Sequence, residues 1–163
     1  MPGPEGGFEK ARLEDVAGLT DLLNAAYGPA EAFLYDGPRT DADEVRARLA
    51  KGTFLLVRSG EGLDGCVYLE GNGDRGYLGM LAVSPRRQGG GLGRALVGAG
   101  ETFLREQGVE RIEIEVVSLR ESLFAFYDRL GYRVTGERPF DYRGLRLPCH
   151  LVVMEKSLHV AGG

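Results

Sequence analysis

The sequence is poor in the features that mark several large classes of protein. It has only two cysteines among 163 residues, Cys66 and Cys149, too few for a disulfide framework and without the spacing of metal ligands. The formal net charge of −4 leaves no basic excess to neutralise phosphates. We therefore expect a reducing compartment, no metal, and no nucleic acid as the main partner.

The sequence also lacks an apolar run long enough to span a membrane, and its start has no apolar segment after a basic region. These absences predict a soluble, cytoplasmic protein with no membrane partner. Hydrophobic residues make up 43% of the chain, enough to build one core. We expect a single domain over residues 8–158, disordered ends at 1–7 and 159–163, and a monomer or a homodimer.

Hydrophobic periodicity predicts alternating strands and helices. A short strand at residues 8–12 is followed by a helix from Val16, which Gly28–Pro29 should stop, and by a helix that Thr40 or Asp41 caps and Gly52 ends. Later strands are expected at 53–59, 65–71, 76–84, 111–117, 132–137 and 149–156, with helices from Leu92 to a stop at Gly108 and over 122–131. The first three of these strands should form an antiparallel meander.

One stretch, "GNGDRG" at residues 71–76, matches the dinucleotide fingerprint G-x-G-x-x-G. That fingerprint works only where a strand enters and a helix leaves, so that a pyrophosphate meets the amides of the helix. Here a second strand leaves, so the stretch is interpreted as a hairpin turn.

A second glycine cluster, "RRQGGGLGRAL" at residues 86–96, lies between a strand and an amphipathic helix. The first turn of a helix has unpaired amides and a partial positive charge, and glycines leave those amides uncovered. The Lys-Ser/Thr pair of a nucleoside-triphosphate loop is missing after Gly93. The pattern therefore predicts a site for a diphosphate ester.

The segment Gln88-Gly-Gly-Gly91-Leu-Gly93 resembles the Q/R-x-x-G-x-G/A motif of the GCN5-related N-acetyltransferase (GNAT) superfamily. "LAVSPRRQGGGLGRAL" resembles that family's strand–loop–helix unit, and "FYDRLGY" resembles its second signature. The resemblance implies an α/β (α+β) fold with a central mixed, mostly antiparallel twisted sheet of six to seven strands, about four flanking helices, and splayed central strands that bind the cofactor.

The resemblance also implies acetyl-CoA as co-substrate. Its pyrophosphate would lie on residues Gln88, Gly89, Gly90, Gly91, Leu92, Gly93 and Arg94, and its pantetheine arm along the main chain of Leu81, Ala82 and Val83. Arg86 and Arg87 are further candidates for the CoA phosphates, although arginines beside a loop are commonly just solvated.

Tyr127 matches the tyrosine that many family members use as general acid toward the CoA sulfur, although a core tyrosine has the same pattern. Glu115 lies twelve positions earlier, as the general base does in the bacterial ribosomal-protein N-terminal acetyltransferases. A glutamate exposed on a strand face is the alternative for Glu115, and Glu70, Tyr77 and His150 are weaker candidates for the base.

Many family members have a cofactor-binding asparagine seven positions before the tyrosine, where this chain has Arg120. Ser118 is a possible replacement. The acceptor would lie between residues 28–41 and 138–150, which carry aromatic and charged side chains, and a small-molecule amine or a peptide N-terminus would suit them. The resulting hypothesis is an N-acetyltransferase, and the alternative is a non-catalytic acetyl-CoA sensor or structural subunit.

Overall fold

The computed structural model describes residues 7–34, 36–60, 62–141 and 145–158. Of the ends expected to be disordered, residues 1–6 and 159–163 lie outside this description. The strands are β1 (Glu9–Lys10), β2 (Thr53–Ser59), β3 (Gly62–Asn72), β4 (Arg75–Val83), β5 (Arg111–Val117), β6 (Arg133–Pro139) and β7 (His150–Ser157). The helices are α1 (Val16–Glu31), α2 (Ala42–Lys51), α3 (Leu92–Glu106) and α4 (Glu121–Arg129), with 3₁₀ turns η1 (Leu13–Asp15) and η2 (Pro85–Arg87).

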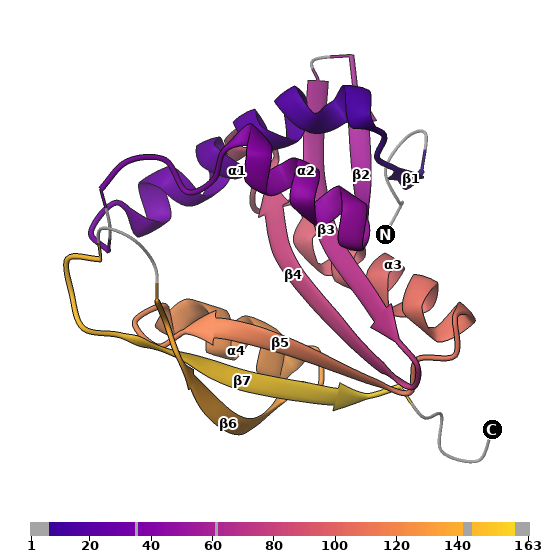
Figure 1. Ribbon diagram of the computed structural model, residues 1–163, viewed down its shortest axis with the longest axis vertical. Helices are drawn as coiled ribbons and strands as arrows, with labels where there is room; N and C mark the ends of the chain where they lie inside the picture. The colour runs from indigo at the N-terminus through magenta and orange to yellow at the C-terminus, as the bar shows by residue number, and fades with distance from the viewer. Residues whose placement is uncertain (1–6, 35, 61, 142–144, 159–163) are drawn as a thin grey trace.

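The strands form one sheet in the order β1-β2-β3-β4-β5-β7-β6 (Figure 1). Neighbouring strands are antiparallel except β4 and β5, which are parallel. The predicted fold class, a mostly antiparallel mixed sheet with about four helices, is therefore confirmed. The "GNGDRG" stretch is the hairpin between β3 and β4, with Asn72 paired to Arg75, as predicted.

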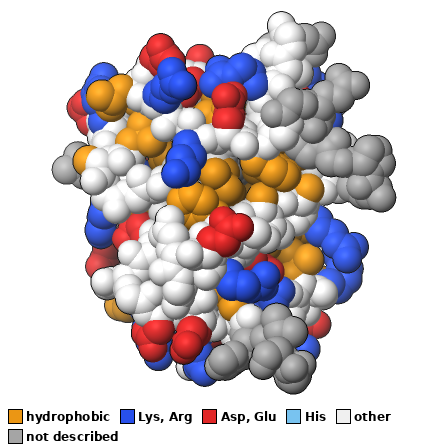
Figure 2. All heavy atoms as spheres, turned by 90° about the vertical axis from the view of Figure 1, so that its right-hand side faces the viewer, with side chains coloured by type: hydrophobic (Ala, Val, Ile, Leu, Met, Phe, Trp, Pro, Cys, Tyr) orange, Lys and Arg blue, Asp and Glu red, His pale blue; other side chains and the backbone are white. Residues whose placement is uncertain are grey.

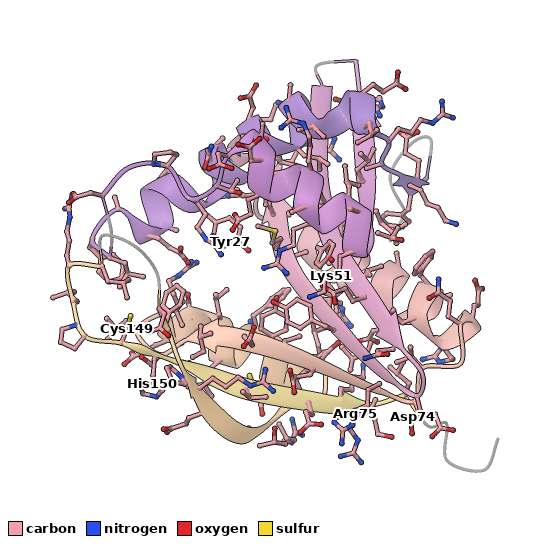
Figure 3. The ribbon with its side chains drawn as sticks, in the orientation of Figure 1. Tyr27, Lys51, Asp74, Arg75, Cys149 and His150 are labelled. Atoms are coloured by element: carbon pink, nitrogen blue, oxygen red, sulfur yellow. The ribbon has the colours of Figure 1, made fainter. Side chains whose placement is uncertain are left out.

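The sheet divides where β4 meets β5. Arg75, Gly76 and Tyr77 pair with Arg111, Ile112 and Glu113, and the register of the two strands contains no pair beyond these. The two halves of the sheet diverge from this junction, where Figure 3 labels Asp74 and Arg75. The divergence opens a space between β4 and β5 in the middle of the protein.

Each face of the sheet has its own core because the central strands are apolar on both sides. Leu55, Val67 and Leu78 pack with α3, whereas Phe54, Tyr68 and Met80 pack with α1 and α2. The strand β2 alternates between the two cores, which explains its continuous apolar run. Helices on both faces hold the β4 half of the sheet.

The first helix is longer than predicted. It continues through Gly28 and Pro29 to Glu31, so the predicted stop at Gly28–Pro29 is wrong. A proline this close to the end of a helix removes a single backbone hydrogen bond. The last turn is held instead by tertiary contacts, because the buried Glu31 carboxylate lies 2.6 Å from Arg120 and 3.8 Å from Arg39. At the second helix, Asp41 is the cap and accepts from the amide of Glu44 at 2.8 Å.

The outer surface carries charges of both signs. Figure 2 shows the face on the right-hand side of Figure 1, where acidic and basic side chains alternate around a central hydrophobic group and neither sign forms a continuous patch. Within the described ranges, none of the helices has the length and apolar character that crossing a membrane requires.

Candidate active site

A cavity of about 230 Å³ lies between the diverging strands β4 and β5. Its apolar walls come from both strands and from Leu123, Phe140 and Leu151. Its polar and charged lining consists of Tyr27, Glu31, Arg39, Glu44, Arg48, Tyr77, Glu115 and Tyr127. The two residues predicted to carry the chemistry, Glu115 and Tyr127, thus line the same cavity.

The β4 wall of the cavity contains a bulge. Cys66 pairs with Ala82 and Tyr68 with Gly79, so Val67 alone on β3 faces both Met80 and Leu81. Met80 has a φ of 46° and is the one non-glycine among the described residues in the left-handed region. Such backbone strain is common at functional sites, where the surrounding structure maintains it.

Tyr27 supports this bulge from the other side of the cavity. Its hydroxyl donates a 2.7 Å hydrogen bond to the carbonyl of Leu81, and burial raises the pKa of Tyr27 well above its usual range. Figure 3 shows Tyr27 directed from α1 toward the space between the two halves of the sheet. The Leu81 carbonyl is therefore engaged within the protein.

The glycine-rich segment after β4 has the predicted strand–loop–helix geometry. Gly89 and Gly91 have φ values of 84° and 83°, which are open to glycine and strained for other residues, and Gly91 is the residue immediately before the first turn of α3. A Cβ at Gly89 would meet nothing within 4 Å, and one at Gly90 would meet only the Arg87 carbonyl, at 3.7 Å. Gln88 donates to the carbonyl of Val83 at 3.2 Å. Side chains therefore leave the backbone uncovered at Gly89 and Gly90, just before the first turn of α3.

The two arginines before this loop face a carboxylate of the protein. Arg86 lies 2.6 Å and Arg87 2.8 Å from Asp64, whose side chain is 1% exposed. Both guanidiniums remain partly exposed at the base of the loop.

Tyr127 lies on α4 and is 7% exposed. Its ring makes edge-on contacts with Phe126 and Tyr132, at centroid distances of 5.0 and 5.6 Å. Burial raises the pKa of Tyr127 well above its usual range, the charge of Tyr77 adds to the rise, and Arg120 opposes it. The phenol therefore stays protonated at neutral pH, as a proton donor must.

Glu115 lies on β5, whose alternation is as predicted. Ile112, Ile114 and Val116 are buried on one face, and Glu113 and Glu115 lie on the other. The Glu115 carboxylate accepts from Arg138 at 3.2 Å and lines the same cavity as Tyr77. Burial first, and then the Glu115 charge, raise the pKa of Tyr77 to about 12, so its hydroxyl stays protonated at neutral pH.

The weaker candidates for the base have other contacts. Glu70 accepts from the Tyr68 hydroxyl at 2.7 Å and lies in a neighbouring cavity of about 190 Å³. His150 begins β7, with its ring 3.6 Å from Glu137, and is not among the residues that line the cavity between β4 and β5 (Figure 3). Ser118 accepts from the amide of His150 at 3.1 Å, and Arg120 is paired with Glu31.

The two segments expected to form the acceptor side do meet. The amide of Arg146 donates to the carbonyl of Leu34 at 2.7 Å, and its guanidinium is paired with Asp36. Phe140 reaches the cavity itself. Tyr35, Tyr142 and Arg143, which belong to these segments, lie outside the described residues.

Sequence reasoning missed three features of the site: the bulge at Met80, the Tyr27 support and the role of Asp64. No local sequence pattern predicts the bulge at Met80 or the contact of Tyr27, because each depends on packing between distant segments. Asp64 has a weak sequence signal, since it is an acidic residue directly before an apolar strand segment.

The sheet opens between β4 and β5, a carboxylate and a neutral phenol line the opening, and a glycine-rich segment precedes α3. This architecture is suited to holding a CoA thioester against an acceptor. The model of the Acetyltransferase (GNAT) family matches residues 17–132, and the chain belongs to this family.

Relatives and solved structures agree with this assignment. The mycothiol acetyltransferase of Propionibacterium freudenreichii is 35% identical over 103 residues, which are 57% of this chain and 33% of that protein. That of Actinosynnema mirum is 29% identical over 142 residues, 80% of this chain and 46% of that protein. The chain thus spans less than half the length of these relatives.

Solved structures show the same fold at low identity. The ribosomal-protein-S18-alanine N-acetyltransferase of Escherichia coli superposes with a TM-score of 0.79 at 18% identity, covering 96% of each chain. An aminoglycoside 6′-N-acetyltransferase complexed with coenzyme A superposes with a TM-score of 0.75 at 18% identity, covering 94% of this chain and 98% of that one.

Proposed function

We propose that this protein transfers an acetyl group from acetyl-CoA directly to a primary amine. The observation that carries the proposal is the cavity between β4 and β5, which both Glu115 and Tyr127 line, in a chain whose glycine segment follows β4 directly. A carboxylate and a neutral phenol are the two proton-transfer groups that the reaction needs.

The cofactor fits the residues present. The amides around Gln88–Arg94 would hold the pyrophosphate, because the glycines leave the backbone uncovered and the α3 terminus favours negative charge. The pantetheine arm would lie along the edge of β4 at Leu81–Val83, where β5 no longer pairs with it. The Tyr27 bond leaves the Leu81 carbonyl less suited to this contact than the neighbouring main-chain groups.

In the chemical step, Glu115 accepts a proton from the acceptor ammonium and frees its nitrogen lone pair. The nitrogen attacks the thioester carbon, where backbone amides of the β4 bulge would stabilise the oxyanion. The C–S bond then breaks and Tyr127 gives its proton to the departing thiolate. The nitrogen releases its second proton as the amide forms, and this proton restores the Tyr127 phenol through solvent. The neutral Tyr77 hydroxyl lines the same cavity and would help to orient the Glu115 carboxylate.

The acceptor is a small amine or a peptide N-terminus. The cavity lining mixes carboxylates with two arginines, and aromatic rings from Tyr27 and Phe140 border it. The names of the similar proteins, which include mycothiol, ribosomal-protein-alanine and aminoglycoside acetyltransferases, support an amine of either kind.

The test is acetyl-CoA binding by calorimetry, followed by thiol release with a panel of amines. Tyr127→Phe should lower kcat by roughly 10²- to 10⁴-fold, the usual contribution of a general acid. Tyr132→Phe is the matched control, since this buried hydroxyl binds Glu101 at 2.9 Å and should affect stability alone. Tight binding without transfer to any amine would instead support the non-catalytic alternative.

A further inference from the structure

Asp64 is a buried carboxylate at an irregular point of β3. Val57 pairs with Gly65 and Arg58 with Leu63, so Asp64 is an extra residue that no β2 residue faces. A bulge of this kind turns a side chain away from its regular direction. Asp64 is thereby directed into the protein, where it is 1% exposed.

Among the described residues, the partners of this side chain lie at the end of β2 and in the segment that leads to the glycine loop. One carboxylate oxygen accepts from Arg86 at 2.6 Å and from the Ser59 hydroxyl at 3.0 Å, and the other accepts from Arg87 at 2.8 Å. The Asp64 carbonyl also accepts from the amide of Ser84 at 2.8 Å. One residue therefore fixes the whole turn between β4 and the loop.

The charges in this cluster matter for the loop. Two adjacent arginines repel each other, and the three-residue turn η2 that carries them has no side-chain cap. A carboxylate between them offsets the repulsion at the base of Gln88–Arg94. Charge-assisted hydrogen bonds of this kind are strong in a buried site.

We propose that Asp64 is a positioning residue for acetyl-CoA binding, which acts through Arg86 and Arg87 to hold the glycine loop in its anion-binding shape. The inference rests on the proposed function, because it takes that loop as the cofactor site. It predicts that loss of the carboxylate weakens acetyl-CoA binding and leaves the chemical step unchanged.

The experiment compares Asp64→Asn with the wild-type chain. Calorimetry should give a Kd for acetyl-CoA about tenfold higher in the variant, by analogy with residues that orient metal ligands, with KM raised and kcat retained at saturation. The double variant Arg86→Gln/Arg87→Gln should bind weakly as well, and adding Asp64→Asn to it should cause no further loss. Glu101→Gln is the control, because it breaks another buried carboxylate pair, to Lys156 and Tyr132, away from the loop.

The outcomes separate the two proposals. A wild-type chain that binds no acetyl-CoA overturns the proposed function, whereas wild-type binding matched by Asp64→Asn overturns only the inference. The inference is also wrong if Asp64→Asn weakens binding equally in the double-arginine background, or if Glu101→Gln raises KM as much. If Asp64→Asn fails to fold, Arg87→Lys tests the inference in its place. This variant keeps the positive charge and loses the guanidinium geometry, so KM should rise and kcat should not change.

Discussion

The left-handed backbone at Gly91 gives a quantitative test of the cofactor loop. Alanine at a φ of 83° costs about 1–2 kcal/mol. If the loop keeps its shape in Gly91→Ala, this cost lowers the stability of the free protein. If the loop relaxes instead, the cost appears on binding, because acetyl-CoA must restore the original shape, and Kd rises about 5- to 30-fold.

Both cases lower the stability of the acetyl-CoA-bound protein by the same amount. Gly98→Ala in α3 is the matched control, since Gly98 is exposed and a Cβ there would meet nothing within 4 Å. Alanine should stabilise that helical position by about 0.5–1 kcal/mol. The two variants should therefore differ by about 1.5–3 kcal/mol when bound, or roughly 3–12 °C in Tm for a domain of this size.

Thermal unfolding with and without saturating acetyl-CoA measures this difference. The reasoning is refuted if bound Gly91→Ala unfolds at or above the wild-type temperature. It is refuted as well if Gly98→Ala, which lies outside the loop, loses affinity to the same extent as Gly91→Ala.

Three further predictions concern the tyrosines. Gly79→Ala places a Cβ 2.6 Å from the Tyr77 hydroxyl, so the ring must leave its present position, and kcat should fall about tenfold while Kd for acetyl-CoA is retained; an unchanged kcat contradicts the role of Tyr77. Tyr27→Phe removes the hydroxyl that donates to the partly buried Leu81 carbonyl and should cost about 1–3 kcal/mol by urea unfolding, and a smaller effect would show that the bulge needs no such support. The protein should begin to lose stability near pH 10, where the tyrosines of the unfolded chain lose their protons. The folded chain keeps these protons to higher pH, because burial raises the pKa of Tyr77 to about 12 and also raises the pKa values of Tyr27, Tyr68, Tyr127 and Tyr132. The folded state then binds more protons than the unfolded state, so stability should fall as the pH rises above about 10. Titration of the tyrosinate absorbance alongside circular dichroism would check this, and tyrosinate formation well before unfolding would refute it.

The sequence was most informative where structure depends on neighbours along the chain. The alternation in "RIEIEVV" placed Glu115 on the face opposite Ile114, and the glycine cluster placed an open backbone before α3. The stop at Gly28–Pro29 was predicted by the same local logic and was wrong. There, ion pairs from Glu31 to Arg39 and Arg120 extend the helix, and the second arginine is 89 residues away.

The rest of the candidate site depends on contacts that no local pattern records. Tyr27 reaches Leu81 across 54 positions, and Asp64 reaches Arg87 across 23. The sequence offered Arg86 and Arg87 as candidates for the CoA phosphates, with solvated arginines as the alternative. It gave no signal of their pairing with Asp64, on which the proposed positioning role depends.

The divergence of β4 and β5 links stability to function. An exposed strand edge is normally paired or covered, because its main-chain groups otherwise lose hydrogen bonds. From Leu78 to Val83, β4 has no partner residue on β5, and its bulge is held from α1 by Tyr27. An extended ligand that adds to this edge supplies the missing partners without displacing a strand. On the proposed function, the folded chain would gain stability when such a ligand binds, and the open edge of β4 would favour an extended acyl carrier.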